Sequence, residues 1–175
     1  MQPPMRQGSP DDFQTPKEAL LPLLPYLNKD WYIWECACGN GNLVRGLEEH
    51  GYHVNGTDIL TGCDFLDWQS RVNTIWMDCI VTNPPFKYKQ QFLEQCYKLG
   101  KPFALLLPLT ALETGKRQSL FAKYGLEIIL FDKRINFETP NKIQNSSSWF
   151  ATAWFTNGLN IGKQLTFATL EKGNL

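Results

Sequence analysis

The chain has 175 residues, a length that fits one domain with a full three-layer core. Hydrophobic residues make up 43% of it and charged residues 19%, the composition of a globular protein, and its 17 basic and 17 acidic side chains cancel. Zero net charge argues against a protein that coats nucleic acid non-specifically, but it leaves room for a local basic patch.

Cysteine content and hydropathy narrow the class of protein further. Five cysteines are an odd number in an ordinary domain, and they favour reduced thiols over a disulfide framework. Cys36 and Cys38 have His50 and His53 nearby, so a zinc site is one alternative, but we favour small buried thiols beside a glycine turn. No apolar stretch approaches the ~20 residues of a membrane span, and no apolar signal core is visible. We therefore expect a soluble cytoplasmic protein that binds no metal and no membrane.

The chain begins with a polar, proline-rich stretch, residues 1–12, that we expect to be disordered. Thr15 is then predicted to cap a helix that runs to about Leu24, with Pro16 in its first position and Glu18 in its first turn.

Strands and helices alternate from there onward. Aromatic and β-branched content predicts strands at 31–35, 53–58, 79–82, 103–107, 127–131 and 149–155. Helical spacing predicts helices near 43–49, through 92–97 and near 117–124. The tail at 161–170 is expected to form an added strand or a contact surface, and Ser146 to Ser148 to form a loop. This alternation predicts an α/β fold with a doubly wound parallel sheet, in which ligands bind outside the carboxyl ends of the strands.

The most informative motif is Asn83-Pro84-Pro85-Phe86, which follows the apolar strand at 79–82. Two consecutive prolines fix φ and remove two N–H groups, so the turn is rigid and its carbonyl groups point in set directions. The turn offers an amide oxygen, a carbonyl oxygen and an aromatic face to an amine on a flat ring. A Pro-Pro pair after a strand is by itself more often a plain loop, so the rest of the chain has to decide.

A second motif follows the first predicted strand. Gly39 and Gly41 allow a tight turn that comes close to a ligand, but the third glycine of a dinucleotide pattern is replaced by Val44, so a pyrophosphate is not indicated. Glu35 and Asp58, at the ends of two strands, can receive the ammonium and ribose hydroxyl donors of a nucleoside cofactor. S-adenosylmethionine has both groups and no pyrophosphate.

Asp64 and Phe65 extend this pattern. Asp64 is placed to hydrogen-bond an adenine amine while Phe65 covers the ring. Each carboxylate alone is equally well explained as a solvated loop residue. Three of them in sequence at strand ends, followed by Asn83, argue against coincidence.

With these motifs the chain resembles class I S-adenosylmethionine-dependent methyltransferases of the DNA adenine-N6 type, in the compact form common in phage genomes. The resemblance covers nearly the whole chain and is carried by residues 12–16, 34–41, 56–59, 62–66, 80–86 and 134–137. It implies one domain, residues 13–175, with a mostly parallel, seven-stranded, Rossmann-like sheet in three layers. Two departures are visible: a usual helix and strand between Asp58 and Asp64 are shortened, and no insertion after Phe86 is long enough for a separate target-recognition domain.

The resemblance also assigns roles to individual residues. The target amine is held by the catalytic residues Asn83, Pro84, Pro85 and Phe86. S-adenosylmethionine is bound by Phe13, Thr15, Pro16, Glu35, Ala37, Gly39, Gly41, Asp58, Ile59, Asp64, Phe65 and Asn83. The substrate is bound by Phe86, Lys87, Tyr88, Lys89 and Arg134, and a second basic edge is expected at Lys116, Arg117, Lys133 and Arg134.

A mechanism follows from these assignments. The exocyclic amine of adenine is a poor nucleophile because its lone pair is delocalised into the ring. Hydrogen bonds to the Asn83 side-chain oxygen and the Pro84 carbonyl would localise that pair and stabilise the positive charge that develops on nitrogen. Phe86 would stack on the target base, flipped from a duplex or offered as a single strand.

Other interpretations of the motif stay open. It also resembles that of enzymes that methylate adenine in ribosomal or transfer RNA, or a glutamine side-chain amide in protein. The outer segments favour DNA over RNA, and favour DNA over protein more strongly. A non-catalytic S-adenosylmethionine-binding module is the alternative from another class, and the intact motif argues against it. The target sequence, its reading by loops near residues 136–148 or by a protein partner, and the oligomeric state are left open.

Overall fold

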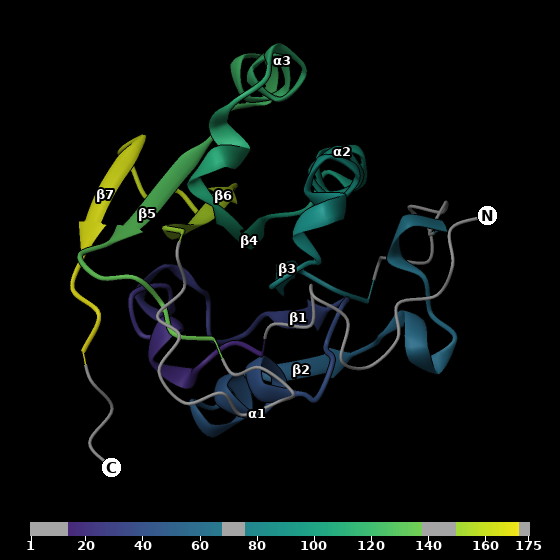
Figure 1. The fold of residues 1–175 in the computed structure, drawn as a ribbon. Helices are drawn as coiled ribbons and strands as arrows, with labels where there is room; N and C mark the ends of the chain where they lie inside the picture. The colour runs from purple at the N-terminus through teal and green to yellow at the C-terminus, as the bar shows by residue number, and fades with distance from the viewer. Residues whose placement is uncertain (1–13, 68–75, 138–149, 172–175) are drawn as a thin grey trace.

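The computed structural model describes residues 14–67, 76–137 and 150–171. Within them seven strands form one sheet in the order β2-β1-β3-β4-β6-β5-β7 (Figure 1). The strands are β1 (Tyr32–Glu35), β2 (His53–Gly56), β3 (Cys79–Thr82), β4 (Phe103–Pro108), β5 (Glu127–Phe131), β6 (Thr152–Asn157) and β7 (Leu165–Ala168). The helices are α1 (Asn42–Glu49), α2 (Lys89–Leu99) and α3 (Gly115–Tyr124). The expected disordered tail, the loop at Ser146 to Ser148 and Trp149 lie outside the described residues.

Strand pairing confirms a mostly parallel seven-stranded sheet. β1 pairs in parallel with β2 and β3, β3 with β4, and β5 with β7, whereas β6 runs antiparallel between β4 and β5. Between Asp58 and Asp64 the structure has a short 3-10 helix, η3 (Ile59–Thr61), and no strand. The seventh strand is instead β7, formed by the tail at the opposite edge of the sheet.

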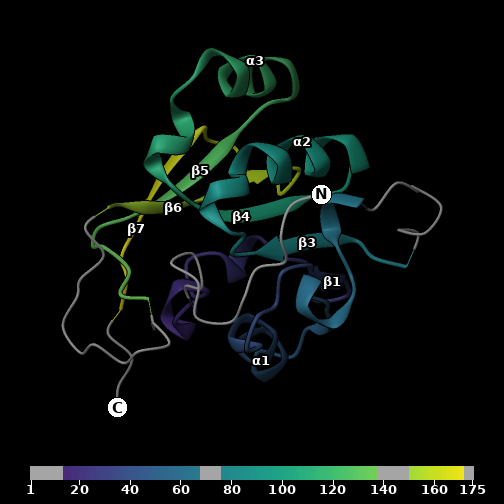
Figure 2. The ribbon, with the colours of Figure 1, turned by 45° about the vertical axis from the view of Figure 1, so that its right-hand side comes forward.

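Helices cover both faces of this sheet, which confirms the three-layer architecture. On β3, Cys79 and Val81 belong to the core that packs against α1, whereas Ile80 belongs to the core that packs against α2. Such alternation is what a strand buried on both faces requires. Figures 1 and 2 show α1 on one side of the sheet and α2 with α3 on the other.

The first predicted helix is wrong in type. In place of one helix from Thr15 to Leu24, the chain forms two short 3-10 helices, η1 (Lys17–Ala19) and η2 (Leu24–Tyr26), and Thr15 is not a cap. Pro22 and Pro25 have no N–H to donate, so a longer α-helix would lose bonds here, and i to i+3 bonds form instead.

The remaining elements lie close to their predicted positions, with several shifted ends. β3 and β5 have the predicted bounds, and the three α-helices lie over the predicted segments. β2 ends at Gly56 rather than at Asp58, because Asp58 turns the chain into η3 by accepting the Leu60 N–H. β6 begins at Thr152 and, as expected of a central strand, lies between two others.

Candidate functional site

The candidate site lies where the direction of the strand order changes. β1 is followed in the chain by β2 on one side and by β3 on its other side, so β1 and β3 flank a topological switch point. The register pairs Ile33 with Cys79 and Trp34 with Ile80, so the carboxyl ends of both strands lie next to each other. In doubly wound sheets such a point is where ligands bind. The fold therefore brings the two motifs singled out in the sequence to one edge.

Glu35 ends β1 as a buried carboxyl group, with 1% of its surface exposed. Burial raises the pKa of Glu35 to about 8, because a charged carboxylate loses hydration there, and the nearby Asp58 charge raises it further. The Ala37 N–H donates to Oε1 at 3.0 Å and acts in the opposite direction. The Thr82 hydroxyl also lowers this pKa, although it makes no hydrogen bond of standard geometry within the described residues. A cation bound beside Glu35 would favour the charged carboxylate that burial disfavours, so this side chain could hold one.

Asp58 braces the glycine turn that follows β1. Its Oδ2 accepts the Gly39 N–H and its Oδ1 accepts the Leu60 N–H, both at 2.9 Å. Gly39 and Gly41 have φ of 50° and 81°, the left-handed region that favours glycine. A carboxylate has lone pairs for about four donors, so Asp58 keeps capacity for a hydroxyl group of a ligand.

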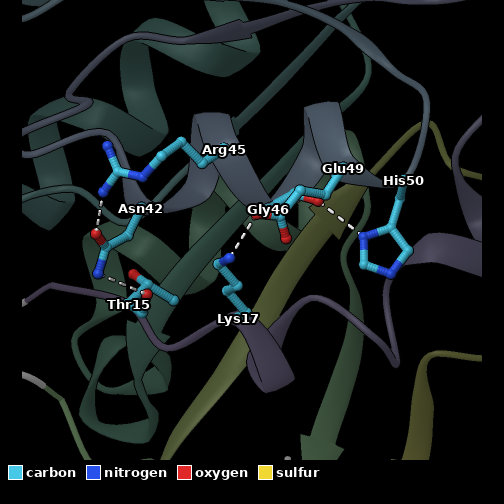
Figure 3. A network of polar contacts seen from close by, with 7 residues as sticks. All are labelled: Thr15, Lys17, Asn42, Arg45, Gly46, Glu49 and His50. Carbon is cyan, nitrogen blue, oxygen red and sulfur yellow. Dashed lines mark hydrogen bonds and ion pairs between the residues drawn. The ribbon is translucent and has the colours of Figure 1, made fainter.

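The segment before η1 is anchored beside the same turn. Figure 3 shows the polar contacts along α1: Asn42 Nδ2 donates to the Thr15 carbonyl at 3.4 Å, and Asn42 Oδ1 accepts from the Arg45 guanidinium at 2.6 Å. Lys17 pairs with Glu49 at 2.6 Å further along. Thr15 and the adjacent Pro16 are therefore held near the glycine turn, as their predicted role requires, whereas Phe13 lies outside the described residues.

Gln14 is a site residue that sequence reasoning missed. Its Oε1 accepts the Asn40 N–H at 3.2 Å. A Cβ atom on Gly39 would come within 2.9 Å of Gln14 Nε2, so the glycine permits this close approach. In the sequence, Gln14 lies between Phe13 and Thr15, two of the predicted cofactor-binding residues. This position was the one sequence feature that pointed to Gln14.

The structure leaves Asp64 able to fill its predicted role but buries the ring of Phe65. Asp64 Oδ1 accepts the Leu66 N–H at 2.9 Å, which leaves the other oxygen for a ligand. Phe65 is 2% exposed and packs against Trp34 and Phe92, with ring centroids 5.3 Å and 5.0 Å away. This burial makes Phe65 a core residue, so its ring has no open face with which to cover an adenine.

Ile59 takes the better position for an apolar contact. It follows Asp58 directly and is 37% exposed, so its side chain is available to cover a flat ring. Phe65 and Ile59 both follow a site carboxylate in the sequence, and only the packing of the core distinguishes them.

The Asn-Pro-Pro-Phe turn extends directly from β3. Pro84 is buried and the side-chain oxygen of Asn83 is also buried. The Pro85 carbonyl accepts the Tyr88 N–H at 2.9 Å and so begins η6 (Phe86–Tyr88). Within the described part of the chain no hydrogen bond is directed at the Pro84 carbonyl. The Pro84 carbonyl therefore keeps its capacity to accept a hydrogen bond from a ligand.

Three aromatic rings gather at the end of this turn. Phe86 meets Phe137 and Phe150 edge to face, with ring centroids 6.1 Å and 5.4 Å away. Phe137 and Phe150 are stacked at 6.3 Å. Neither was among the predicted site residues, although Phe137 ends one of the stretches that carry the resemblance. Phe150 gave no sequence signal, because its approach to Phe86 depends on the path of the chain between distant elements.

The structure separates the basic residues by role. Arg117 is 8% exposed and donates to the carbonyls of Ala111 and Thr110, so it is a structural residue and not part of a basic edge. Lys116 pairs with Glu94 at 2.9 Å. Lys89 donates to the Phe86 carbonyl at 3.2 Å and so supports the turn. Lys133 donates to the Leu170 carbonyl at 3.4 Å. Lys87 and Arg134 are exposed and stay candidates for phosphate contacts.

The thiols near the site are neutral. Burial raises the pKa of Cys36 well above its usual value and that of Cys38 to about 11. The residues that the structure describes contain no group of three or more metal-ligating side chains. Nor do they include a helix with the length and apolar character needed to cross a membrane.

Comparisons with known proteins agree with this topology. No protein-family model and no curated protein matches the chain. Among solved structures, it resembles a modification subunit of a putative type I restriction enzyme from Vibrio vulnificus, with 13% identity and a TM-score of 0.58. The likeness shows the fold. It covers 95% of this chain and 49% of that one, so the chain spans about half the length of that neighbour.

Two further neighbours have lower TM-scores. A SAM-dependent methyltransferase from Archaeoglobus fulgidus has 13% identity and a TM-score of 0.49, over 80% of this chain and 90% of that one. A TehB-like SAM-dependent methyltransferase from Corynebacterium glutamicum has 19% identity and a TM-score of 0.47, over 80% and 86%. Neither of these two likenesses carries an argument. The strand order and the layers are those of the predicted α/β fold, and the activity has to be argued from the site.

Proposed function

We propose that this chain is an S-adenosylmethionine-dependent methyltransferase that modifies the exocyclic N6 amine of adenine in DNA. The observation that carries the proposal is the juxtaposition at the switch point. The rigid Asn83–Phe86 turn leaves β3 directly beside the buried Glu35 and the glycine turn of β1. In this arrangement a site for a cationic nucleoside cofactor would adjoin a site for a planar amine.

The cofactor side fits S-adenosylmethionine by its donor set. Glu35 would receive the ammonium group, since a cation favours the charged form that burial otherwise disfavours. Asp58 would accept the ribose hydroxyl groups and Asp64 the adenine amine, with Ile59 against the ring. Ala37, Gly39 and Gly41, with Thr15 and Pro16, would enclose the methionine part. When bound, the cofactor supplies an electrophilic methyl group.

The amine side would act by accepting hydrogen bonds. The Asn83 side-chain oxygen and the Pro84 carbonyl would accept from the two N–H groups of the target amine. These bonds draw the nitrogen lone pair out of the ring and stabilise the positive charge that develops during transfer. Because both prolines restrict the turn, the acceptors are held in position before the substrate arrives.

The base would be held by aromatic contact. Phe86 is proposed to stack on the target ring, with Phe137 and Phe150 supporting it from the side. Tyr88 and Lys89 complete the turn, and Lys87 and Arg134 are proposed to meet flanking phosphates.

The choice of DNA is supported by two observations. The motif stretches resemble the DNA adenine-N6 type along nearly the whole chain. The neighbour of highest TM-score among those described above is itself a modification subunit of a putative restriction enzyme. Because no insertion after Phe86 is long enough for a separate target-recognition domain, we also propose that a protein partner contributes to target recognition.

The test is transfer of labelled methyl from S-adenosylmethionine to unmethylated double-stranded DNA, with the modified base identified after digestion. We expect N6-methyladenine from the native protein and a loss of about 10²- to 10³-fold in Asn83→Ala, the effect of removing one acceptor for developing charge. Asn28→Ala, which changes the same residue type near the opposite ends of the strands, should retain full activity.

Calorimetry of cofactor binding makes a negative result interpretable. Binding with no label in DNA, but with label in RNA or in a protein glutamine, would replace the DNA assignment by that substrate. Absence of cofactor binding would contradict the methyltransferase proposal as a whole.

A further inference from the structure

β7 ends the sheet of the described residues, so one of its long edges has no neighbouring strand there. Two large apolar side chains stand on this strand: Leu165 is 46% exposed and Phe167 is 77% exposed. They lie on one face because alternate residues of a strand point the same way. In Figure 1 this strand lies beyond β5, at the end of the sheet opposite to β2.

The hydrogen-bond pattern defines which backbone groups of β7 face the open edge. The Gln164 carbonyl, just before β7, accepts from Ile128 of β5 at 2.8 Å, and the Ala168 carbonyl accepts from Asp132, just after β5, at 2.9 Å. Thr166 is in register with Ile129. In a parallel ladder the residues that bond one neighbour alternate with those that point away. The even-numbered residues of β7 therefore bond β5, and the N–H and C=O groups of Leu165, Phe167 and Thr169 point outward.

An open edge of this kind is normally protected. Proteins block such edges with prolines, inward charges or bulges, because unpaired N–H and C=O groups invite another strand. The stretch from Leu165 to Leu170 contains no proline and no charged residue. The nearest charges are Lys163 on one side and Glu171 on the other, both exposed and without an ion pair in the described part of the chain.

We propose that this edge pairs with the same edge of a second copy of the chain. The two β7 strands would run antiparallel, with a two-fold axis at Phe167, so that Phe167 lies opposite itself and Leu165 opposite Thr169. This register joins outward-pointing residues only, as an antiparallel ladder requires. It continues the sheet from one copy into the other and closes the assembly as a dimer.

Charge complementarity selects a second copy as the occupant. Lys163 and Glu171 flank β7, and continued pairing in this register would bring Lys163 of one copy opposite Glu171 of the other, twice by two-fold symmetry. The aromatic pair at Phe167 would then lie between the two ion pairs. Opposite charges and aromatic residues directly across an antiparallel pair are stabilising, and like charges there are destabilising.

The first test is the molecular mass of the protein in solution, measured by sedimentation velocity over a range of concentrations. We expect a dimer whose dissociation constant rises at least about tenfold in Phe167→Lys, a charge at the centre of the edge. Leu112→Lys, at another exposed apolar residue far from β7, should leave the dimer unchanged.

Charge exchange tests the register. Lys163→Glu should weaken the dimer about tenfold, because it places like charges opposite each other twice. The double variant with Glu171→Lys should restore the native dissociation constant. A double variant as weak as the single one would overturn the proposed register.

Hydrogen exchange provides a readout with an internal control. The amides of Leu165, Phe167 and Thr169 should exchange quickly at low concentration and slowly in the dimer. The amides of Thr166 and Ala168 should be protected in both, because they bond β5. A monomer at all concentrations, or a dimer without this alternating protection, would overturn the proposal. None of these measurements depends on methyl transfer.

Discussion

Glu35 shows how the sheet changes the chemistry of a single residue. Burial raises the pKa of its carboxyl group to about 8, so at neutral pH the ligand-free protein holds it largely protonated. A cation that binds there has to displace the proton, because only the carboxylate attracts it. Occupancy of the site is therefore linked to pH.

The direction in which pH changes the affinity for the cofactor follows from this proton. Affinity for S-adenosylmethionine should rise from about pH 6 to about pH 8 and then level off, as the cost of removing the proton disappears. Calorimetry in buffers of different ionisation enthalpy should detect proton release on binding at about pH 7. Glu35→Gln keeps the acceptor for the Ala37 N–H and should bind more weakly, with this release abolished. Equal proton release in both proteins would contradict the role of Glu35.

Two buried threonines of β6 make a matched pair. Thr152 is 2% exposed and its hydroxyl has no hydrogen-bond partner in the described residues, whereas the Thr156 hydroxyl donates to the Glu127 carbonyl at 2.9 Å. A buried hydroxyl without a partner costs stability, and one that is bonded contributes it.

Valine at the two positions should therefore have opposite effects. Thr152→Val is expected to raise the free energy of unfolding by about 1 kcal/mol, and Thr156→Val to lower it by about 1 kcal/mol. Urea unfolding of both variants tests this. A loss of stability in Thr152→Val would show that its hydroxyl has a partner in the folded protein.

At the scale of elements, the short connections after β2 hold the site together. Asp58 begins η3 and at the same time bonds the Gly39 N–H across from β1, so one side chain joins two loops. Asp64 begins η4 (Phe65–Asp67) with one bond to the Leu66 N–H. Asp58 thus holds two backbone N–H groups, whereas Asp64, in the same kind of position, holds one.

Substitution of each aspartate by asparagine tests how much these hydrogen bonds contribute to stability. Asn has one acceptor oxygen, so Asp58→Asn loses one of two bonds and should lower the free energy of unfolding by about 1 to 3 kcal/mol. Asp64→Asn keeps its single bond and should cost less than about 0.5 kcal/mol, since Asn also caps well. Unfolding in urea at neutral pH compares them. Equal losses would contradict the bracing role of Asp58.

For the whole molecule, the sheet has a buried centre and two exposed edges. Every residue of β3 and β4 is buried, whereas most of β2 and half of β7 are exposed. Local opening requires least energy where few apolar contacts are lost. The carboxyl end of β3, which carries the Asn-Pro-Pro-Phe turn, is therefore supported by the most rigid part of the fold.

Native-state hydrogen exchange in dilute protein should show this gradient. We expect the slowest amides in β3 and β4, with exchange close to the free energy of global unfolding, and faster exchange in β2 and β7. Protection of β2 equal to that of β3 would indicate that a further part of the chain covers that edge.

Much of the architecture follows from local pattern. The apolar run at 79–82, bounded by charged residues and prolines, specifies a buried strand whatever its neighbours are, and β3 has those bounds. The same holds for β5 and for the glycine turn after β1, because φ preferences and apolar periodicity act over a few residues. The α/β class and the location of the candidate site at strand ends were predictable for this reason.

Tertiary structure alone decided the environment of each site residue. Phe65 and Ile59 both follow a site carboxylate, yet one is in the core and the other is exposed, because burial depends on elements distant in sequence. The approach of Phe150 to Phe86, the raised pKa of Glu35 and the alternating edge of β7 arise in the same way. Sequence by itself determined which residues end the strands, and long-range packing and strand pairing determined what each of them contacts.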